Sequence, residues 1–318
     1  MSFNHSHLLN TKQFQKSDLE QIIDFSHDIE NHPEKYQDLL KGKILSTLFY
    51  EASTRTRISF EAAMIKLGGS VISNPGMVQF SSVSKGETLK DTAKVIGSYC
   101  DIMAIRHPEK GSVEEFSKGS DIPTINAGDG IAEHPTQALL DMYTIEKSLG
   151  RINNFKIAFV GDLKYGRTVH SLVRLLRRFD NIEFVFVSPE QLKIPHKIAK
   201  KTNHRNTFCM NDGIQDVDII YMTRIQKERF KNKKEYKKFV GVYHLNKTIL
   251  DTLGDVKVMH PLPRVDELST DLDNDPRSIY FDQVKNGLYV RMVIISLLLG
   301  HKKREKKSSL LCSSPVLD

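Results

Sequence analysis

The stretch from Glu51 to Arg57, Glu-Ala-Ser-Thr-Arg-Thr-Arg, lies between two segments of different character. The apolar run from Ile44 to Tyr50 predicts a buried strand, and the segment from Ile58 to Leu67 predicts a helix that stops at Gly68. The first turn of a helix leaves backbone N–H groups unpaired and carries the positive end of the helix dipole. Hydroxyl and guanidinium groups placed there predict an anion-binding site after a strand of an α/β fold.

A capped helix with two solvated arginines is the alternative interpretation of this stretch, and it would suffice for a lone Ser/Thr-x-Arg. Here five consecutive residues carry side-chain donors, and their number favours the anion site. They are Ser53, Thr54, Arg55, Thr56 and Arg57.

Ser-Thr-Arg-Thr-Arg after a strand resembles the carbamoyl-phosphate signature of the transcarbamoylase family. With the segments described below, the resemblance runs from about Leu19 to about Leu299. It implies an α/β fold of two doubly wound parallel-sheet domains joined by long helices. Residues 1–149 would bind carbamoyl phosphate, with a C-terminal helix at 286–300 packing back on them. Residues 150–285 would bind aspartate, and we expect the charged tail, 301–318, to be disordered.

Composition limits the class of protein. A chain of 318 residues with 39% hydrophobic content suggests two domains with sizeable cores. The three cysteines, Cys100, Cys209 and Cys312, are far apart, which favours a reducing compartment over a structural zinc site. No signal peptide is visible at the N-terminus, and the longest apolar run, 292–299, is too short for a bilayer. We therefore expect a cytoplasmic protein without a membrane partner.

The formal net charge of +7 invites a nucleic-acid interpretation. Five basic residues and one acidic residue between His301 and Lys307 supply +4 of it, so the rest of the chain is only mildly basic. Basic and aromatic residues do not alternate as they do in nucleic-acid-binding segments. We expect no nucleic-acid partner, and an enzyme for anionic substrates would itself be mildly basic.

Two further strand ends carry polar residues. The strand predicted at 101–105 is followed by Arg106, and the one at 122–126 leads to His134-Pro135-Thr136-Gln137. Ligands of α/β folds bind at the carboxyl ends of parallel strands. Pro135 suits the first position of a helix, so His134 would lie at a helix N-terminus, where a neutral imidazole is favoured. A lone histidine there is usually structural, but the pairing with Arg106 fits the family's ligand site.

The segment Gly161-Asp-Leu-Lys-Tyr-Gly-Arg-Thr168 nearly matches a nucleotide phosphate loop, but Arg167 stands where that motif has lysine. Arginine does not simply replace a compact point charge, and no Gly-x-Gly-x-x-Gly is present for a dinucleotide. The same residues fit the transcarbamoylase pattern, in which this arginine binds the substrate's α-carboxylate. The segment also resembles catalytic chains that associate with separate regulatory chains, which leaves that partnership open.

A polar loop containing Ser81 and Lys85 reads, taken alone, as a mobile surface loop. The family resemblance instead implies that both side chains enter the active site of a neighbouring subunit, in a homotrimer with shared sites. The family often has a second basic residue just before the lysine, and this chain has Ser84 there.

The resemblance assigns roles to residues of both domains. It implies that the phosphate is bound by Ser53, Thr54, Arg55, Thr56, Ser81 and Arg106. The carbonyl oxygen would be polarised by Thr56, Arg106 and His134, with Gln137 near the carbamoyl nitrogen and Lys85 bridging both substrates. Aspartate would be bound by Arg167, Arg224 and Gln226, assisted by backbone at Pro261 and Leu262. Glu51 would pair with Arg167 and Arg229 when the domains close; the conformation of the lysine-rich stretch 230–238 is left open.

These residues include many cationic donors but no strong nucleophile, metal cluster or cofactor motif. They suit transfer of a carbamoyl group to an amine without a covalent enzyme intermediate. The resemblance implies that carbamoyl phosphate is the donor and L-aspartate the acceptor, giving N-carbamoyl-L-aspartate and phosphate in pyrimidine biosynthesis. No cofactor and no metal are expected.

Two alternatives remain open. An ornithine carbamoyltransferase would need acidic recognition of a cationic amine and usually has a cysteine in the motif that reads His260-Pro-Leu-Pro263 here. A catalytically silent scaffold would be expected to lack some of Arg55, Lys85, Arg106 and His134, and all four are present.

Overall fold

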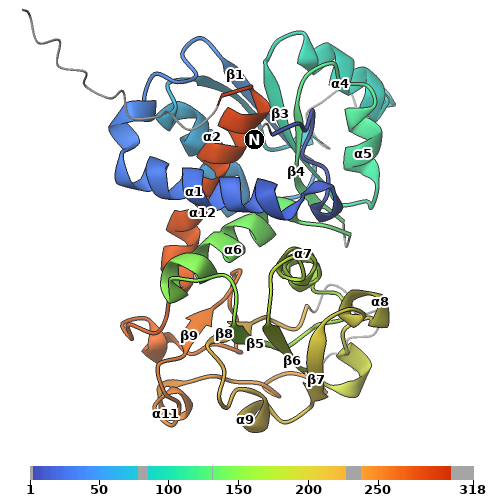
Figure 1. Ribbon diagram of the computed structural model, residues 1–318. Coiled ribbons are helices and arrows are strands. Elements are labelled where there is room, and N and C mark those ends of the chain that lie inside the picture. Colours follow the sequence, from blue (N-terminus) through green and yellow to red (C-terminus); the bar gives the residue numbers. More distant parts are fainter. Residues whose placement is uncertain (1–2, 78–84, 131, 227–237, 302–318) are drawn as a thin grey trace, which may run out of the picture.

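The computed structural model describes residues 3–77, 85–130, 132–226 and 238–301. Ser81, Arg229, the stretch 230–237 and the tail after His301 lie outside the described residues, so the expectations attached to them stay predictions. Within the described chain, strands form two wholly parallel sheets, one in each half of the molecule. We call the β1–β4 sheet with its helices the first lobe and the β5–β9 sheet with its helices the second lobe (Figure 1).

The first sheet has the order β2-β1-β3-β4 among the described strands. The central strand β1 is buried on both faces, because its residues point alternately into two hydrophobic clusters. Leu45 and Phe49 belong to one cluster and Leu48 to the other. The elements of this lobe are η1 (Thr11–Gln13), α1 (Lys16–Asn31), η2 (Pro33–Tyr36), β1 (Ile44–Phe49), α2 (Thr54–Lys66), β2 (Ser70–Asn74), α4 (Leu89–Gly97), β3 (Ile102–His107), α5 (Ser112–Ser117), β4 (Thr124–Asp129) and α6 (Pro135–Leu149).

The second sheet has the order β7-β6-β5-β8-β9 among the described strands. Phe159 and Val160 of its central strand again point into separate clusters on opposite faces. The elements are β5 (Phe155–Val160), α7 (Arg167–Leu176), β6 (Ile182–Val187), η4 (Glu190–Leu192), α8 (His196–Ala199), β7 (Asn203–Thr207), α9 (Met210–Gly213), β8 (Ile219–Met222), α11 (Lys247–Leu250), β9 (Lys257–Met259), η6 (Thr270–Leu272) and α12 (Tyr280–Leu298).

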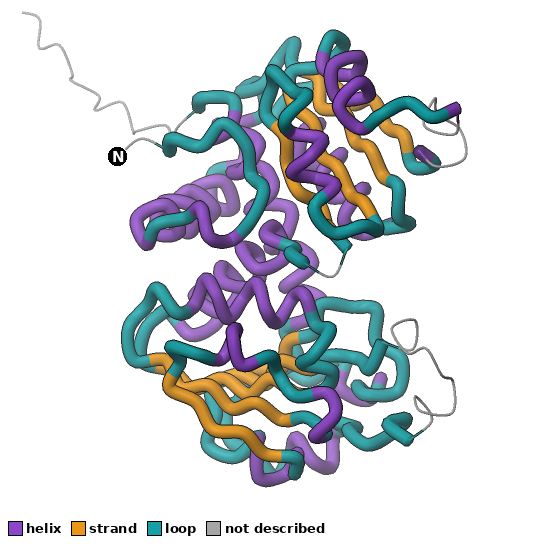
Figure 2. Tube along the Cα trace, turned by 90° about the vertical axis from the view of Figure 1, so that its right-hand side faces the viewer, coloured by secondary structure: helices purple, strands orange, loops and turns teal. Residues whose placement is uncertain are grey.

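Helices α6 and α12 join the lobes. They pack on each other where the two lobes meet, and α12 also packs on α1 and α2 (Figures 1 and 2). Residues 290–298 of α12 are all buried, and all but Arg291 and Ser296 are apolar. A single hydrophobic cluster therefore continues from Phe60 in the first lobe through Val293 to Phe159 in the second. The predicted fold of two doubly wound sheets joined by long helices is confirmed; the domain boundaries stay a prediction.

The order in which the chain connects the strands determines where each sheet can bind a ligand. The chain leaves β1 toward β2 and returns on the other side as β3; it leaves β5 toward β6 and returns as β8. In such sheets a crevice opens at the carboxyl ends of the two strands between which the direction of winding reverses. The segments after β1 and β3, and after β5 and β8, are therefore the natural positions for ligand-binding residues.

Two segments of the second lobe differ from what the sequence indicates. The basic sequence from Gln191 to Lys201 predicts a helix, but only the short α8 (His196–Ala199) forms, because Pro195 precedes it and Lys201 adopts φ +78°. Strand β7, Asn203–Thr207, was not predicted, since its polar sequence lies on an exposed sheet edge and lacks an apolar pattern.

We predict that Gly161→Ala destabilises the second lobe. Gly161 follows β5 with φ +125°, and a Cβ there would lie 2.1 Å from the carbonyl oxygen of Thr223. Backbone strain and a clash with main chain together should lower the free energy of unfolding by at least about 2 kcal/mol. Gly254→Ala is the matched control, because a Cβ at Gly254 meets nothing within 4 Å. Equal urea midpoints for the two variants would contradict this account.

Candidate active site

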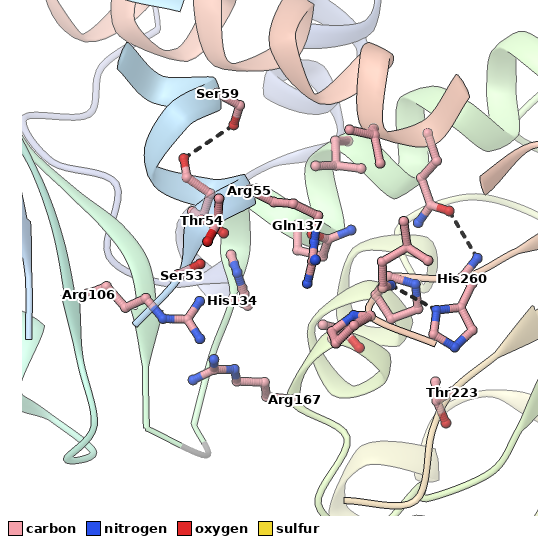
Figure 3. A pocket seen from close by; sticks show the side chains of 18 of the residues that line it. Ser53, Thr54, Arg55, Ser59, Arg106, His134, Gln137, Arg167, Thr223 and His260 are labelled. Atoms are coloured by element: carbon pink, nitrogen blue, oxygen red, sulfur yellow. Dashed lines mark hydrogen bonds between the residues drawn. The ribbon is translucent and has the colours of Figure 1, made fainter. Parts of the chain in front are cut away.

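One cavity lies between the carboxyl ends of the two sheets and has a volume of about 470 Å³. Its walls come from both lobes and from α12, and many of its side chains are hydrogen-bond donors (Figure 3). The lining consists of Glu51, Ala52, Ser53, Thr54, Arg55, Thr56, Ser59, Arg106, His134, Gln137, Leu140, Gly166, Arg167, Thr168, Thr223, Arg224, Gln226, His260, Pro261, Leu262, Pro263, Gln283, Val284 and Arg291.

The first wall is the N-terminal turn of α2. Ser53 is its N-cap residue, with extended backbone and no capping hydrogen bond from its own side chain, and Thr54, Arg55 and Thr56 form the first turn. No acidic residue occupies this turn, so the positive end of the helix is left for a ligand. Figure 3 shows Ser53, Thr54 and Arg55 facing the same space as Arg106 and His134.

Arg57 does not belong to this wall, and its prediction as a fifth donor was wrong. Its Nη1 atom donates to Glu61 Oε1 at 3.1 Å and to Ser73 Oγ at 2.9 Å. Its partner Glu61 lies one helical turn further along α2, so the guanidinium of Arg57 points away from the N-terminal end of the helix. Arg55 therefore faces the cavity and Arg57 does not.

Glu51 connects the two lobes. Its Oε2 atom accepts a hydrogen bond from Arg106 Nε at 2.9 Å and lies 3.5 Å from Arg167 Nη2. Arg106 is at the end of β3, whereas Arg167 is the first residue of α7 and also donates to the carbonyl of Gly130. The expected pair of Glu51 with Arg167 is present, and the pair with Arg106 was not predicted.

His134 is the N-cap residue of α6, followed by Pro135 at the first helical position. Its imidazole is buried, and Nδ1 has no hydrogen-bond partner among the described residues. Burial, reinforced by the charges of Arg167, Arg106 and Arg291, lowers the pKa of His134 well below its ordinary value. The ring is therefore neutral at neutral pH.

The opposite wall follows the strands of the second lobe. Arg224 and Gln226 come after β8, and Pro261 and Leu262 come after β9. Leu262 adopts φ +53° before a cis peptide bond, and its backbone N–H donates to His260 Nδ1 at 2.8 Å. The Nε2 atom of His260 is in turn 2.7 Å from Glu267 Oε1, so this loop is anchored by buried side chains.

The two walls influence each other electrostatically. Partial burial, together with the charge of Arg224, lowers the pKa of Arg55 from its usual value. Arg55 belongs to the first lobe and Arg224 to the second, so the two predicted half-sites face one cavity. Lys85 is not part of its lining, and the Lys85 side chain is exposed.

Sequence reasoning missed three buried polar residues near the cavity. Arg291 of α12 and Gln283 line it, and Asp141 lies behind it on α6. Burial raises the pKa of Asp141 to about 7, although hydrogen bonds from Tyr221, Gln283 and Gln137 oppose that shift. Two features of the sequence could have indicated these residues. Arg291 is a lone arginine inside the apolar run of α12, and Asp141 is a carboxylate one helical turn after Gln137.

The described residues contain no group of three or more His, Cys, Asp or Glu side chains that could hold a metal ion. In the same part of the chain, no helix combines the length and apolar character needed to cross a bilayer.

These features define a two-lobed α/β protein whose shared cavity presents cationic groups from both lobes to anionic ligands. The family model described as the carbamoyl-phosphate-binding domain of aspartate/ornithine carbamoyltransferases matches residues 6–147. The Asp/Orn-binding domain of the same family matches residues 153–298. The chain belongs to the aspartate/ornithine carbamoyltransferase family.

Known relatives cover nearly the whole chain. The aspartate carbamoyltransferase catalytic subunit of Clostridium novyi is 48% identical over 299 residues, which cover 92% of this chain and 97% of that protein. The subunit of the same name from Leptospira biflexa is 48% identical over 309 residues, covering 94% and 98%.

Solved structures agree with this assignment. The catalytic subunit of M. jannaschii aspartate transcarbamoylase superposes with a TM-score of 0.86 at 47% identity, covering 93% of this chain and 98% of that one. Aspartate transcarbamoylase from Trypanosoma cruzi in complex with carbamoyl phosphate and aspartate has a TM-score of 0.85 at 39% identity, covering 91% and 95%.

The buried neutral state of His134 predicts a pH dependence of stability. In the unfolded chain the imidazole takes up a proton near its ordinary pKa of about 6.5, whereas the folded chain resists it. Protonation therefore favours the unfolded state as the pH falls. The free energy of unfolding of the parent should drop relative to His134→Asn by about 1 kcal/mol between pH 6.5 and 5.5.

The measurement is urea unfolding of both proteins at several pH values. The other histidines are common to the two proteins and cancel in the difference. If the free energy of unfolding depends on pH in the same way for the parent and for His134→Asn, the prediction is wrong and the His134 imidazole titrates normally in the folded protein.

Proposed function

We propose that this protein catalyses carbamoyl transfer from carbamoyl phosphate to L-aspartate, yielding N-carbamoyl-L-aspartate and phosphate. The observation that carries the proposal is that one cavity is lined both by the donors after β1 and β3 and by the arginines after β5 and β8. Family membership supplies the reaction class, and the cationic lining favours a dicarboxylate as the second substrate. We further propose that the reaction serves pyrimidine biosynthesis in the cytoplasm; the described cysteines, Cys100 and Cys209, are free thiols.

The phosphate half-site is the N-terminal turn of α2. Backbone N–H groups of that turn, the hydroxyls of Ser53, Thr54 and Thr56, and the guanidinium of Arg55 would surround the phosphate oxygens. Arg106 reaches the same space from β3 (Figure 3). Such donors bind the substrate and also stabilise the negative charge of the departing phosphate.

The carbamoyl carbonyl lies between the two half-sites in this proposal. Thr56, Arg106 and His134 polarise its oxygen, and Gln137 contacts the carbamoyl nitrogen. Because the His134 ring is neutral, it donates one hydrogen bond without adding another full charge beside Arg106 and Arg167. A preorganised set of donors is then in place when the oxyanion forms.

Aspartate occupies the second half-site. Arg167, Arg224 and Gln226 bind its carboxylates, and backbone at Pro261 and Leu262 completes the contact. Its neutral amine attacks the carbonyl carbon and a tetrahedral oxyanion forms. The bond from carbon to the phosphate oxygen then breaks, and the departing phosphate takes up the proton that the amine nitrogen loses. No covalent enzyme intermediate is needed, because positioning and charge stabilisation supply the rate enhancement.

Glu51 keeps the two lobes in a fixed position relative to each other during the reaction. It already contacts Arg106 of one lobe and Arg167 of the other. We propose that Arg229 joins this group when the lobes close on the substrates. Each arginine would then be shared between a carboxylate of the protein and an anionic substrate group.

Ornithine carbamoyl transfer is disfavoured by charge. Ornithine would bring its second ammonium toward Arg224, and two like charges about 4 Å apart at an effective dielectric near 20 repel by roughly 4 kcal/mol. We therefore predict turnover of aspartate with no comparable turnover of ornithine when the purified protein is assayed with both in parallel. Equal rates with the two amines would overturn the choice of aspartate.

Arg224→Ala should separate the two half-sites. Removing one partner of a desolvated charge pair costs roughly 2–5 kcal/mol, so the aspartate KM should rise at least about thirtyfold. The KM for carbamoyl phosphate should stay within about twofold, because its proposed ligands lie on the first lobe. Arg205→Ala is the matched control. Arg205 lies on the exposed strand β7, pairs with Asp212 and is not part of the cavity lining. An unchanged aspartate KM would contradict the assignment.

We also propose a homotrimer with shared active sites, to which Ser81 and Lys85 contribute across the interface. The exposed position of Lys85 outside the cavity lining supports a role in another copy of the chain.

Inactive Lys85→Ala mixed with inactive His134→Ala, after reversible dissociation, should regain activity, because hybrid trimers contain some sites with both native residues. Each variant taken alone through the same cycle should stay inactive. Hybrids that form but remain inactive would rule out shared sites.

A further inference from the structure

Three consecutive residues of the cavity lining, Pro261, Leu262 and Pro263, have no hydrogen-bond donor to offer a ligand. Proline has no backbone N–H, and none of the three side chains carries a polar atom. The remaining N–H, that of Leu262, donates to His260 Nδ1 at 2.8 Å (Figure 3). Only carbonyl oxygens are left, so this part of the wall can accept hydrogen bonds from a ligand and cannot donate them.

The protonation of the His260 ring follows from that backbone contact. An N–H group can only donate, so Nδ1 of His260 must be unprotonated where it meets Leu262. The neutral ring then carries its proton on Nε2, which lies 2.7 Å from Glu267 Oε1 and donates to it. His260 is 2% exposed and Glu267 is 4% exposed, so this pair is buried behind the wall.

The His260 residue is held from two sides. The Glu267 carboxylate also accepts from the backbone N–H of Val265 at 3.3 Å and from that of Asp266 at 3.2 Å. The backbone N–H of His260 donates to Gln283 Oε1 of α12 at 3.0 Å. Nδ1 therefore cannot move away from Leu262 without breaking a buried hydrogen bond.

Leu262 depends on this contact because of its backbone conformation. Its φ of +53° lies in the left-handed region, which a residue with a Cβ atom adopts unfavourably. Such a conformation persists only where the surrounding structure holds it in place. Without the bond to His260, the backbone can relax, and the carbonyl groups of Pro261 and Leu262 then change direction.

We propose that His260, oriented by Glu267, is a positioning residue that keeps the backbone at 261–263 a hydrogen-bond acceptor for the amine of the second substrate. The inference rests on the proposed function, because that amine is the one of L-aspartate. The arginines of the cavity can bind the carboxylates of any dicarboxylate, whereas carbonyl oxygens favour only a ligand that brings an N–H. His260 would therefore help to select an amino dicarboxylate over one that lacks the amine.

Two substitutions of His260 separate its two hydrogen bonds. In His260→Asn the side-chain oxygen takes the place of Nδ1 and can accept from the N–H two residues later, as in an Asx turn, but the contact with Glu267 is lost. In His260→Gln the longer amide reaches the position of Nε2 and can donate to Glu267, but a methylene group replaces the acceptor for Leu262.

The readout compares aspartate with succinate, which has the same two carboxylates and no amine. In His260→Gln the aspartate KM should rise about tenfold, as for the loss of a hydrogen bond. The inhibition constant of succinate, measured against aspartate at saturating carbamoyl phosphate, should change less than about twofold, because succinate has no N–H to lose. In His260→Asn the aspartate KM should stay within about threefold of the parent.

Urea unfolding distinguishes positioning from a merely structural role. His260→Asn loses a charge-assisted hydrogen bond to a buried carboxylate, so its urea midpoint should lie below that of His260→Gln. The less stable variant is thus expected to bind aspartate better. If His260→Gln does not fold, His260→Met replaces it, since it differs from His260→Asn in lacking the acceptor for Leu262.

Each outcome bears on the inference. An aspartate KM that rises in the glutamine or methionine variant and not in the asparagine variant, with succinate inhibition unchanged, supports it. Equal aspartate KM values in these variants, or an equal loss for aspartate and succinate, would overturn it and leave the proposed function intact. A parent protein that forms no carbamoylaspartate would overturn the proposed function, and this inference with it.

Discussion

Mutual repulsion among cationic side chains is the constraint that the rest of this structure has to satisfy. Arginines from both lobes line one cavity, and the Glu51 carboxylate pairs with two of them, Arg106 and Arg167. Repulsion between close like charges is on the order of 1–4 kcal/mol per pair in such surroundings. The cavity walls would therefore separate unless something else held them together. The hydrophobic cluster that continues through α6 and α12 into both lobes provides that restraint.

The same restraint explains how the site functions. Donors held in place before a ligand arrives do not have to reorganise when negative charge develops on it. Binding of two anionic substrates relieves the repulsion, so part of the affinity comes from strain already present in the protein. Stability is lower than it would be with apolar residues at these positions, as is common for active sites.

Much of the fold and of the candidate site could be predicted from the sequence, because the patterns that indicate them are local. Strand Ile44–Phe49, the donors after it and the proline after His134 each specify structure within a few residues. Arg57 was counted among the donors of the anion site because its hydrogen bond to Ser73 on β2 cannot be read from the local sequence. Strand β7 was missed because an exposed edge strand needs no apolar residues. The hydrogen-bond network around Asp141 joins residues up to 142 positions apart, and no local sequence pattern predicts such a contact.

Glu51 and Asp141 both connect the two lobes, but they are suited to different tasks. The Glu51 side chain is 33% exposed, so it can exchange protein contacts for water or substrate at modest cost. Asp141 is 0% exposed, and moving it would leave the side chains of Gln137, Gln283 and Tyr221 without the acceptor that they share. Motion between the lobes is therefore easier at the open side of the cavity, near Glu51, than at the closed side, near Asp141. Residues beside Asp141 can keep a fixed geometry toward the reacting group while residues beside Glu51 adjust to the arrival and departure of substrates.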